Sequence, residues 1–118
     1  MWEIILDRGD ICLVDFNPAK GGEMGKLRPA IIMSKKEEAD ILATVIVIPL
    51  STVVEKDTFP YRYMISAREK LEKNSDACMY EIRALSKVRV KEKLASLSEE
   101  EIATVQKALC SILGKETY

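Results

Sequence analysis

Residues 10–34 read DICLVDFNPAKGGEMGKLRPAIIMS and decide how the chain is organised. Apolar residues dominate 11–16 and 29–34, and the segment between them contains three glycines, which give its backbone unusual freedom. This pattern predicts two β-strands joined by a polar loop. Charged side chains gather in that loop, and Arg28 stands directly before Pro29, where the second strand begins. We therefore expect the chemistry of the protein here.

The composition is that of one ordinary domain. The chain has 118 residues, of which 47% are hydrophobic and 31% are charged, so we expect a single soluble domain over 1–118. Eighteen basic residues balance nineteen acidic ones, which gives no overall sign of nucleic-acid binding but leaves a local basic groove open. No apolar run is long enough to cross a bilayer, and the first residues lack a signal-peptide pattern, so we expect a cytoplasmic protein.

The chain contains no histidine, which excludes histidine-based acid–base catalysis and histidine-ligated metal sites. Its three cysteines, Cys12, Cys78 and Cys110, are widely spaced in apolar surroundings and form no C-x-x-C motif. They are typical of buried, reduced thiols in a cytoplasmic protein. We therefore expect neither a metal nor a cofactor.

Several further segments have the composition of short strands. The most apolar one, 41–50, contains four consecutive β-branched residues, which indicates a central strand that is buried on both faces and ended by Pro49. Charged residues fill 35–40, and we expect an exposed connection there. The remaining predicted strands are 59–65, 77–85 and 87–90.

The pattern of the C-terminal segment predicts a helix, the clearest one in the sequence. Ser98 with Glu101 three residues later forms a capping-box pattern, and Gly114 marks the end of the helix. An apolar stripe joins Ile102, Val105, Leu109 and Ile112. Together with five to seven short strands, this helix predicts a mainly β protein, folded as a small curled barrel.

Two side chains of the first loop could carry chemistry. Arg28 keeps its proton and could clamp a phosphate through two parallel hydrogen bonds. Glu23, the only carboxylate in the loop, could act as a base toward a ribose hydroxyl. The alternative is an ordinary surface ion pair, which composition alone favours.

Other candidates lie further along the chain. Ser51 and Thr52 follow the most apolar strand, and they could either satisfy backbone groups at its end or donate hydrogen bonds to a phosphate. If 77–85 is one strand, Glu81 and Arg83 share a face, where they form an ion pair or line a groove that binds bases. Three lysines could supply a positive rim or be merely solvated: Lys20, Lys26 and Lys56.

Three stretches together resemble the MazF/PemK/Kid family of toxin endoribonucleases from bacterial toxin–antitoxin pairs. They are RGDICLVDFNPAKGGEMGKLRPAIIMS, IVIPLST and SDACMYEIRALSKVRV, and they occur in the family's order. The resemblance implies an SH3-like barrel of the CcdB/MazF/Kid type, with a C-terminal α-helix. It also implies a homodimer that cleaves single-stranded RNA (mRNA) at short sequences, without a metal. The products would carry 2′,3′-cyclic phosphate and 5′-hydroxyl ends, and a cognate antitoxin protein would neutralise the enzyme.

The resemblance also assigns roles to residues. Arg28 matches the family's catalytic arginine, Ser51 matches its active-site threonine, and Glu23 matches a loop glutamate proposed as the base. Three residues depart from the pattern: Met24 and Glu81 stand where glutamine is usual, and Ala84 stands where threonine or serine follows. A carboxylate at Glu81 accepts hydrogen bonds where an amide can also donate, so it could change base preference or weaken RNA binding by repulsion.

Two other functions remain open at this level. A toxin of the same fold could act without catalysis by binding a protein target such as gyrase. A small barrel could also bind RNA or a peptide and do nothing further. The arginine in the loop favours the nuclease.

Overall fold

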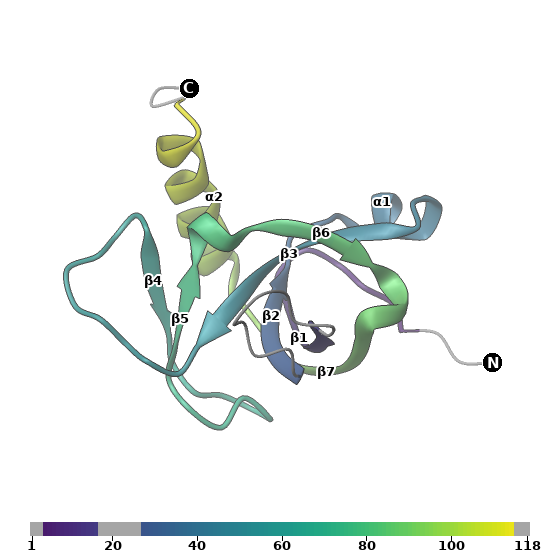
Figure 1. Cartoon of the computed structure of the whole chain (residues 1–118), viewed down its shortest axis with the longest axis horizontal. Coiled ribbons are helices and arrows are strands. Elements are labelled where there is room, and N and C mark those ends of the chain that lie inside the picture. The colour runs from purple at the N-terminus through teal and green to yellow at the C-terminus, as the bar shows by residue number, and fades with distance from the viewer. Residues whose placement is uncertain (1–3, 17–26, 115–118) are drawn as a thin grey trace.

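The computed structural model describes residues 4–16 and 27–114. These residues form one antiparallel sheet of seven strands with two helices (Figure 1), so the predicted mainly β class with a C-terminal helix is confirmed. The strands are β1 (Asp10–Asp15), β2 (Leu27–Ile32), β3 (Thr44–Ser51), β4 (Arg62–Ile65), β5 (Ser75–Cys78), β6 (Arg83–Ser86) and β7 (Val90–Ser96). The helices are α1 (Lys36–Ile41) and α2 (Glu99–Ile112).

Strand β3 is the centre of the sheet. The strands lie in the order β4-β5-β3-β2-β1-β7, and β6 pairs with the first half of β3. The sheet curls, but among the described residues no ladder joins β4 to β7, so the barrel is not closed by strand pairing. A single backbone bond, from Lys70 N–H to Leu94 O at 3.0 Å, instead ties the turn after β4 to β7.

Strand β1 and the second half of β2 pack between two apolar layers. On one face, Ile11 and Ile31 pack with Val105 of α2. On the other face, Cys12 and Val14 pack with the N-terminal segment and α1. Because successive side chains of a strand point to opposite faces, the alternation in 11–16 distributes β1 between the two apolar layers.

Helix α2 follows its sequence prediction closely. The N–H of Glu101 donates to Ser98 Oγ at 3.1 Å, and the N–H of Ser98 donates to Glu101 Oε1 at 2.8 Å, which completes the capping box. The predicted stripe faces the sheet, with Val105 fully buried. Gly114 has a φ of +97° directly after the helix, as a terminating glycine should.

The prediction of one strand over 77–85 is wrong. The chain forms β5, then a 3₁₀ turn at Met79–Glu81, then β6. Both strands pair with β3, but the two ladders are out of register by three residues, which is the length of the turn. Pro49 lies between the two paired parts of β3 and has no N–H to donate, so the ladder on this side cannot run through it.

Five smaller expectations also differ from the structure. On the β2 side Pro49 stays paired, with Ala30, and β3 continues to Ser51. The first half of β3 is not buried on both faces, since Ile46 is 44% exposed. Segment 35–40 forms most of the short helix α1, whose Ala39 is buried. Strand β4 is shorter than expected. Of the predicted strand 87–90, Lys87–Arg89 forms a 3₁₀ turn and only Val90 belongs to a strand, as the first residue of β7.

Candidate active site

Arg28 lies on β2 beside the end of β3. Its backbone is paired with Val14 of β1, and its side chain is half-buried. On the other side β2 pairs with β3 from Ala30↔Pro49 onward. Arg28 lies two residues before Ala30 and Ser51 lies two residues after Pro49, so both predicted residues lie just beyond the same end of this ladder, on neighbouring strands. Within the described part of the chain, no hydrogen bond or ion pair engages the Arg28 guanidinium.

Ser51 is the last residue of β3, and its side chain is half-buried. Its Oγ accepts a hydrogen bond from Val53 N–H at 3.1 Å. A hydroxyl that accepts this bond still has its own proton to donate. The side chain is therefore suited to donate toward a phosphate oxygen, while it also stabilises the turn that follows.

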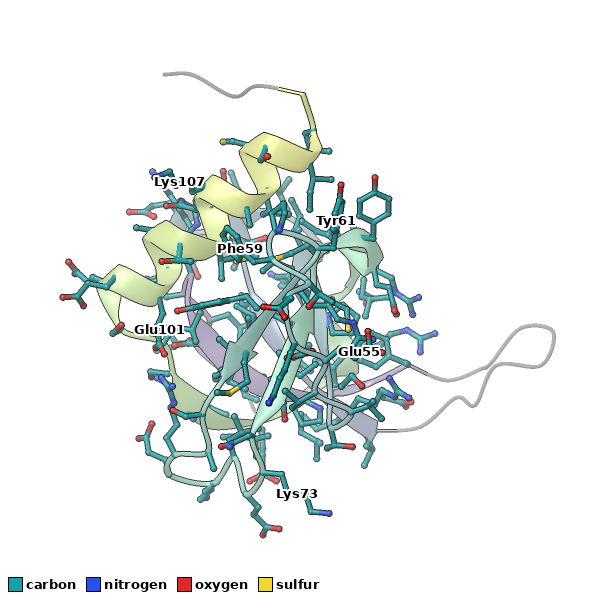
Figure 2. All side chains as sticks on the ribbon, turned by 90° about the vertical axis from the view of Figure 1, so that its left-hand side faces the viewer. Glu55, Phe59, Tyr61, Lys73, Glu101 and Lys107 are labelled. Atoms are coloured by element: carbon teal, nitrogen blue, oxygen red, sulfur yellow. The ribbon has the colours of Figure 1, made fainter. Side chains whose placement is uncertain are left out.

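A buried carboxylate supports this turn from behind. Asp76 is the register partner of Ser51 in the β3–β5 ladder and is 1% exposed. Its Oδ2 accepts from Glu55 N–H at 2.9 Å and from Arg62 Nη1 at 3.2 Å. Figure 2 shows the turn that carries Glu55 in front of the sheet.

Arg62 of β4 reaches the same turn from the other side. Its Nη1 donates both to Asp76 and to Val53 O, the latter at 2.8 Å. The hydrogen bond to Asp76 raises the pKa of Arg62, so the guanidinium stays charged. Val53 is thus held at both backbone groups, its N–H by Ser51 and its C=O by Arg62.

Four charged side chains of this region affect the pKa of Cys78. Burial raises the pKa of this thiol, and the positive charges of Arg62 and Arg28 oppose the rise. The negative charges of Glu81 and Asp76 add to it. Arg62 is the register partner of Cys78 in the β4–β5 ladder and binds Asp76, which precedes Cys78 by two residues. We call the following residues the strand-end cluster: Arg28, Ser51, Arg62 and Asp76.

The other predicted residues lie around this cluster rather than in it. Glu81 is exposed at the end of the 3₁₀ turn, so it does not share a strand face with Arg83. The Arg83 guanidinium instead lies 4.8 Å from the centre of the Phe16 ring, a cation–π contact. Lys56 is exposed in the turn after Ser51, one residue beyond Glu55.

Thr52 opens onto a groove. An open cavity of about 270 Å³ is lined by Thr52, Pro29 and the turn before β5, which contributes Lys70 and Lys73. Glu72 also lines this groove, and Lys70 pairs with Glu92 at 3.7 Å, so the two lysines are partly balanced by carboxylates. The remaining predicted residues, Lys20, Glu23 and Lys26, lie outside the described residues, as does Met24.

Sequence reasoning missed Arg62 and Asp76. Asp76 lies among the small and apolar residues of β5, and an acidic residue at a buried strand position is a signal of a paired or functional charge. Its partner Arg62 is fourteen residues away in the sequence, and the pairing becomes visible only once β4 and β5 are aligned. Cys12 and Cys78 are buried, as expected, whereas Cys110 is only half-buried.

The fold and the cluster define a small antiparallel β-sheet protein with an arginine and a hydroxyl at neighbouring strand ends, a site suited to a phosphate. The sequence pattern of the PemK-like, MazF-like toxins of type II toxin–antitoxin systems matches residues 7–113. The chain is also 35% identical over 115 residues to the endoribonuclease MazF of Staphylococcus epidermidis, which covers 97% of this chain and 96% of that protein. The chain therefore belongs to this toxin family.

Solved structures support the same fold. The crystal structure of MazF from Deinococcus radiodurans superposes with a TM-score of 0.77 at 23% identity, over 95% of this chain and 99% of that one. A MazE–MazF structure from the same organism gives 0.76 at 22% identity, over 95% and 98% of the two chains. These relatives give no support to the gyrase-directed alternative. Neither helix within the described residues is long and apolar enough to cross a membrane.

Proposed function

We propose that this chain is a sequence-selective, metal-independent endoribonuclease, an mRNA interferase that cleaves single-stranded RNA. The observation that carries the proposal is the placement of Arg28 and Ser51 at neighbouring ends of β2 and β3. The naming of the Staphylococcus epidermidis relative as an endoribonuclease supports it. The toxin domain extends over 1–118.

The reaction is a transesterification followed by product release. The 2′-hydroxyl oxygen attacks the adjacent phosphorus while Glu23 accepts its proton. The bond from phosphorus to the 5′-oxygen breaks, and that oxygen takes up a proton from solvent. A 2′,3′-cyclic phosphate and a 5′-hydroxyl remain. Arg28 and Ser51 stabilise the charge that develops on the phosphate oxygens, through two hydrogen bonds from the guanidinium and one from the hydroxyl.

The RNA strand extends over the surroundings of the cluster. Basic and polar side chains there contact its phosphates and bases, in the manner of other single-strand grooves. Glu81 sets base preference, since it can accept hydrogen bonds but not donate them. The proposed RNA-binding residues are Lys20, Lys26, Thr52, Lys56, Glu81 and Arg83.

A second copy of the chain and an antitoxin are the proposed protein partners. The MazE–MazF structures of Deinococcus radiodurans support an antitoxin complex, and an extended acidic segment would neutralise a basic groove. We propose that the toxin is a homodimer. Its RNA substrate and its free thiols favour the cytoplasm.

Cleavage of RNA in the presence of EDTA tests the function. The wild type is mixed with a panel of single-stranded RNAs that covers all short sequences, and 5′-hydroxyl ends are mapped by sequencing. We expect cleavage at one short motif, and loss of cleavage in Arg28→Ala. Lys107→Ala, which removes an exposed cation on α2 (labelled in Figure 2), is the matched control and should cleave like the wild type. A folded wild type that leaves the whole panel intact would refute the proposal.

A further inference from the structure

The turn after Ser51 is held by an ion pair between a buried carboxylate, Asp76, and a partly exposed arginine, Arg62. Asp76 is 1% exposed and Arg62 is 24% exposed, with 3.2 Å between Oδ2 and Nη1. Taking such charges out of water costs about as much as their attraction returns, and apolar residues of similar volume often serve stability as well or better. An ion pair in this place therefore calls for a reason other than stability.

The contacts of the pair supply that reason. Both of its members bind the backbone of the residues that follow Ser51: Asp76 accepts from Glu55 N–H, and Arg62 donates to Val53 O. Val53 N–H in turn donates to Ser51 Oγ. Moving Val53 would therefore move the hydrogen-bond partner of the Ser51 hydroxyl and change the direction in which that hydroxyl donates.

We infer that Arg62 and Asp76 are positioning residues for the endoribonuclease reaction, which fix the Ser51 hydroxyl toward the phosphate through the backbone at 53–55. The inference rests on the proposed function. Neither residue contacts the substrate in this scheme. Asp76 acts as the register partner behind Ser51, and Arg62 clamps the outer side of the turn.

The test replaces the pair by apolar side chains of similar size. Arg62→Met combined with Asp76→Leu leaves no unpaired buried charge, so the variant should fold. We expect kcat for RNA cleavage to fall by about 10- to 100-fold, because a small misplacement of a catalytic group is costly. KM should change by less than about threefold, since ground-state binding is left intact.

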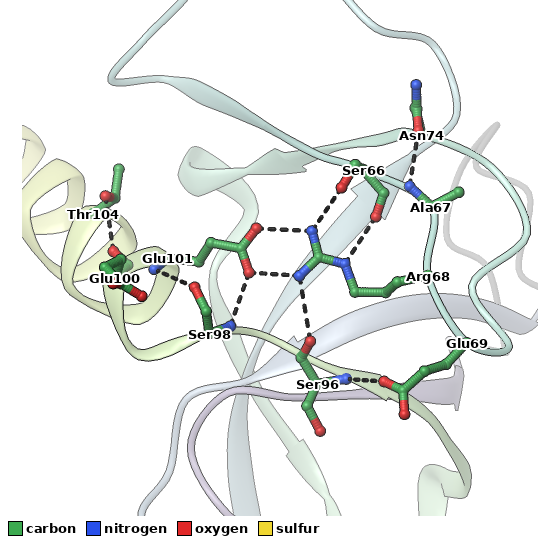
Figure 3. A network of polar contacts seen from close by, with 10 residues as sticks. All are labelled: Ser66, Ala67, Arg68, Glu69, Asn74, Ser96, Ser98, Glu100, Glu101 and Thr104. Carbon is green, nitrogen blue, oxygen red and sulfur yellow. Dashed lines mark hydrogen bonds and ion pairs between the residues drawn. The ribbon is translucent and has the colours of Figure 1, made fainter.

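A second arginine–carboxylate pair provides the matched control. Arg68 and Glu101 are 22% and 19% exposed, and Arg68 also donates to Ser66 and Ser96 (Figure 3), far along the chain from Ser51. Arg68→Met removes an arginine of similar burial without touching the strand-end cluster. It should lower thermal stability and leave kcat unchanged at a temperature where the protein is folded.

A measurement without RNA keeps the inference separate from the proposed function. Amide hydrogen exchange at Val53 and Glu55 should accelerate by at least about tenfold in the double variant, while the rest of β3 keeps its ladder. The Glu55 N–H loses its acceptor Asp76, and the Val53 N–H becomes more mobile because the carbonyl of the same residue loses Arg62. A wild type that cleaves no RNA refutes the proposed function only. A folded double variant with wild-type kcat, or with unchanged exchange at these two amides, refutes the positioning role.

Discussion

Ser51 and Asp76 are register partners in the ladder between β3 and β5, so the hydroxyl at the end of β3 is backed by a carboxylate that is 1% exposed. The carboxylate does not act on the hydroxyl directly. It binds Glu55 N–H and Arg62, and these contacts shape the turn onto which Ser51 is bonded. The hydroxyl and its support therefore come from three different strands, β3, β4 and β5.

The first prediction concerns the hydroxyl itself. Ser51→Ala removes the donor that we assign to the developing phosphate charge and should lower kcat by about 10²-fold, the usual cost of losing one such donor. Ser51→Thr keeps the hydroxyl and should retain cleavage within about threefold, as expected from the threonine that the resemblance places here. Steady-state cleavage of a fluorogenic RNA measures both. Equal activity of the alanine and threonine variants would remove Ser51 from the mechanism.

The second prediction concerns base preference. Glu81 is exposed at the end of the 3₁₀ turn, and its negative charge helps to raise the pKa of the Cys78 thiol beside the strand-end cluster. Glu81→Gln removes repulsion toward phosphate and adds a donor, so RNA should bind more tightly and the cleavage motif should change at one base. Sequencing of 5′-hydroxyl ends from the same RNA pool gives both motifs.

Glu99→Gln is the control for this experiment. It makes the same change of net charge at an exposed position in the first turn of α2. A global electrostatic effect would raise RNA affinity equally in both variants. An unchanged motif in Glu81→Gln would show that this residue does not contact a base.

The elements that sequence reasoning predicted well depend on local patterns. The alternation in β1, the apolar end of β2 and the capping box of α2 each lie within a few residues of sequence. Arg28 and Ser51 are candidates because each stands beside a proline or a strand end that is visible in the sequence, and their proposed roles come from the family resemblance. Local hydrogen bonding and side-chain periodicity decide such features, so a single chain is enough to recognise them.

The missed features depend on which strands pair. Residues 77–85 have strand composition, yet the ladder that they form with β3 is interrupted at Pro49. A 3₁₀ turn at Met79–Glu81 separates its two parts. The pairing of Arg62 with Asp76 likewise requires the β4–β5 register. Asp76 in the apolar strand β5 is a local sign of a paired charge, but the local sequence shows neither its partner nor the interruption of the ladder, because the other residue involved lies many positions away.

The third prediction concerns stability at low pH. Arg68 donates to both carboxylate oxygens of Glu101, at 2.5 and 2.7 Å, and this hydrogen bonding lowers the pKa of Glu101 (Figure 3). A carboxylate whose pKa is lowered by folding stabilises the protein above its unfolded pKa of about 4.3 and loses this effect as pH falls toward the folded pKa. Arg68→Met should therefore lower the free energy of unfolding by about 1–3 kcal/mol at pH 7.

The difference between Arg68→Met and the wild type should shrink as pH is lowered from 5 to 3. Urea unfolding followed by circular dichroism measures it at each pH. Lys36→Met, which breaks the fully exposed Lys36–Asp40 pair, should give no measurable change at any of these pH values. A pH-independent loss in Arg68→Met would mean that packing of the arginine stem, rather than its charge, carries the effect.

The fourth prediction concerns Gly9, where the turn before β1 meets α2. Gly9 has a φ of +96°, and a Cβ built on it would lie 2.5 Å from Ile102 Cδ1. Gly9→Ala should therefore lower the free energy of unfolding by about 1–2 kcal/mol for the backbone conformation, with a further loss from the contact. Gly114 has nearly the same φ, +97°, with nothing within 4 Å, so Gly114→Ala isolates the backbone effect at an open position.

A second substitution separates the two contributions at Gly9. Ile102→Val removes Cδ1, the atom nearest to the new methyl group, and should restore part of the stability of Gly9→Ala. Urea unfolding of the wild type, the two single variants and the double variant gives the four free energies of a double-mutant cycle. Additive losses would show that the Ile102 side chain moves aside without cost. The left-handed backbone conformation would then be the only reason for a glycine at position 9.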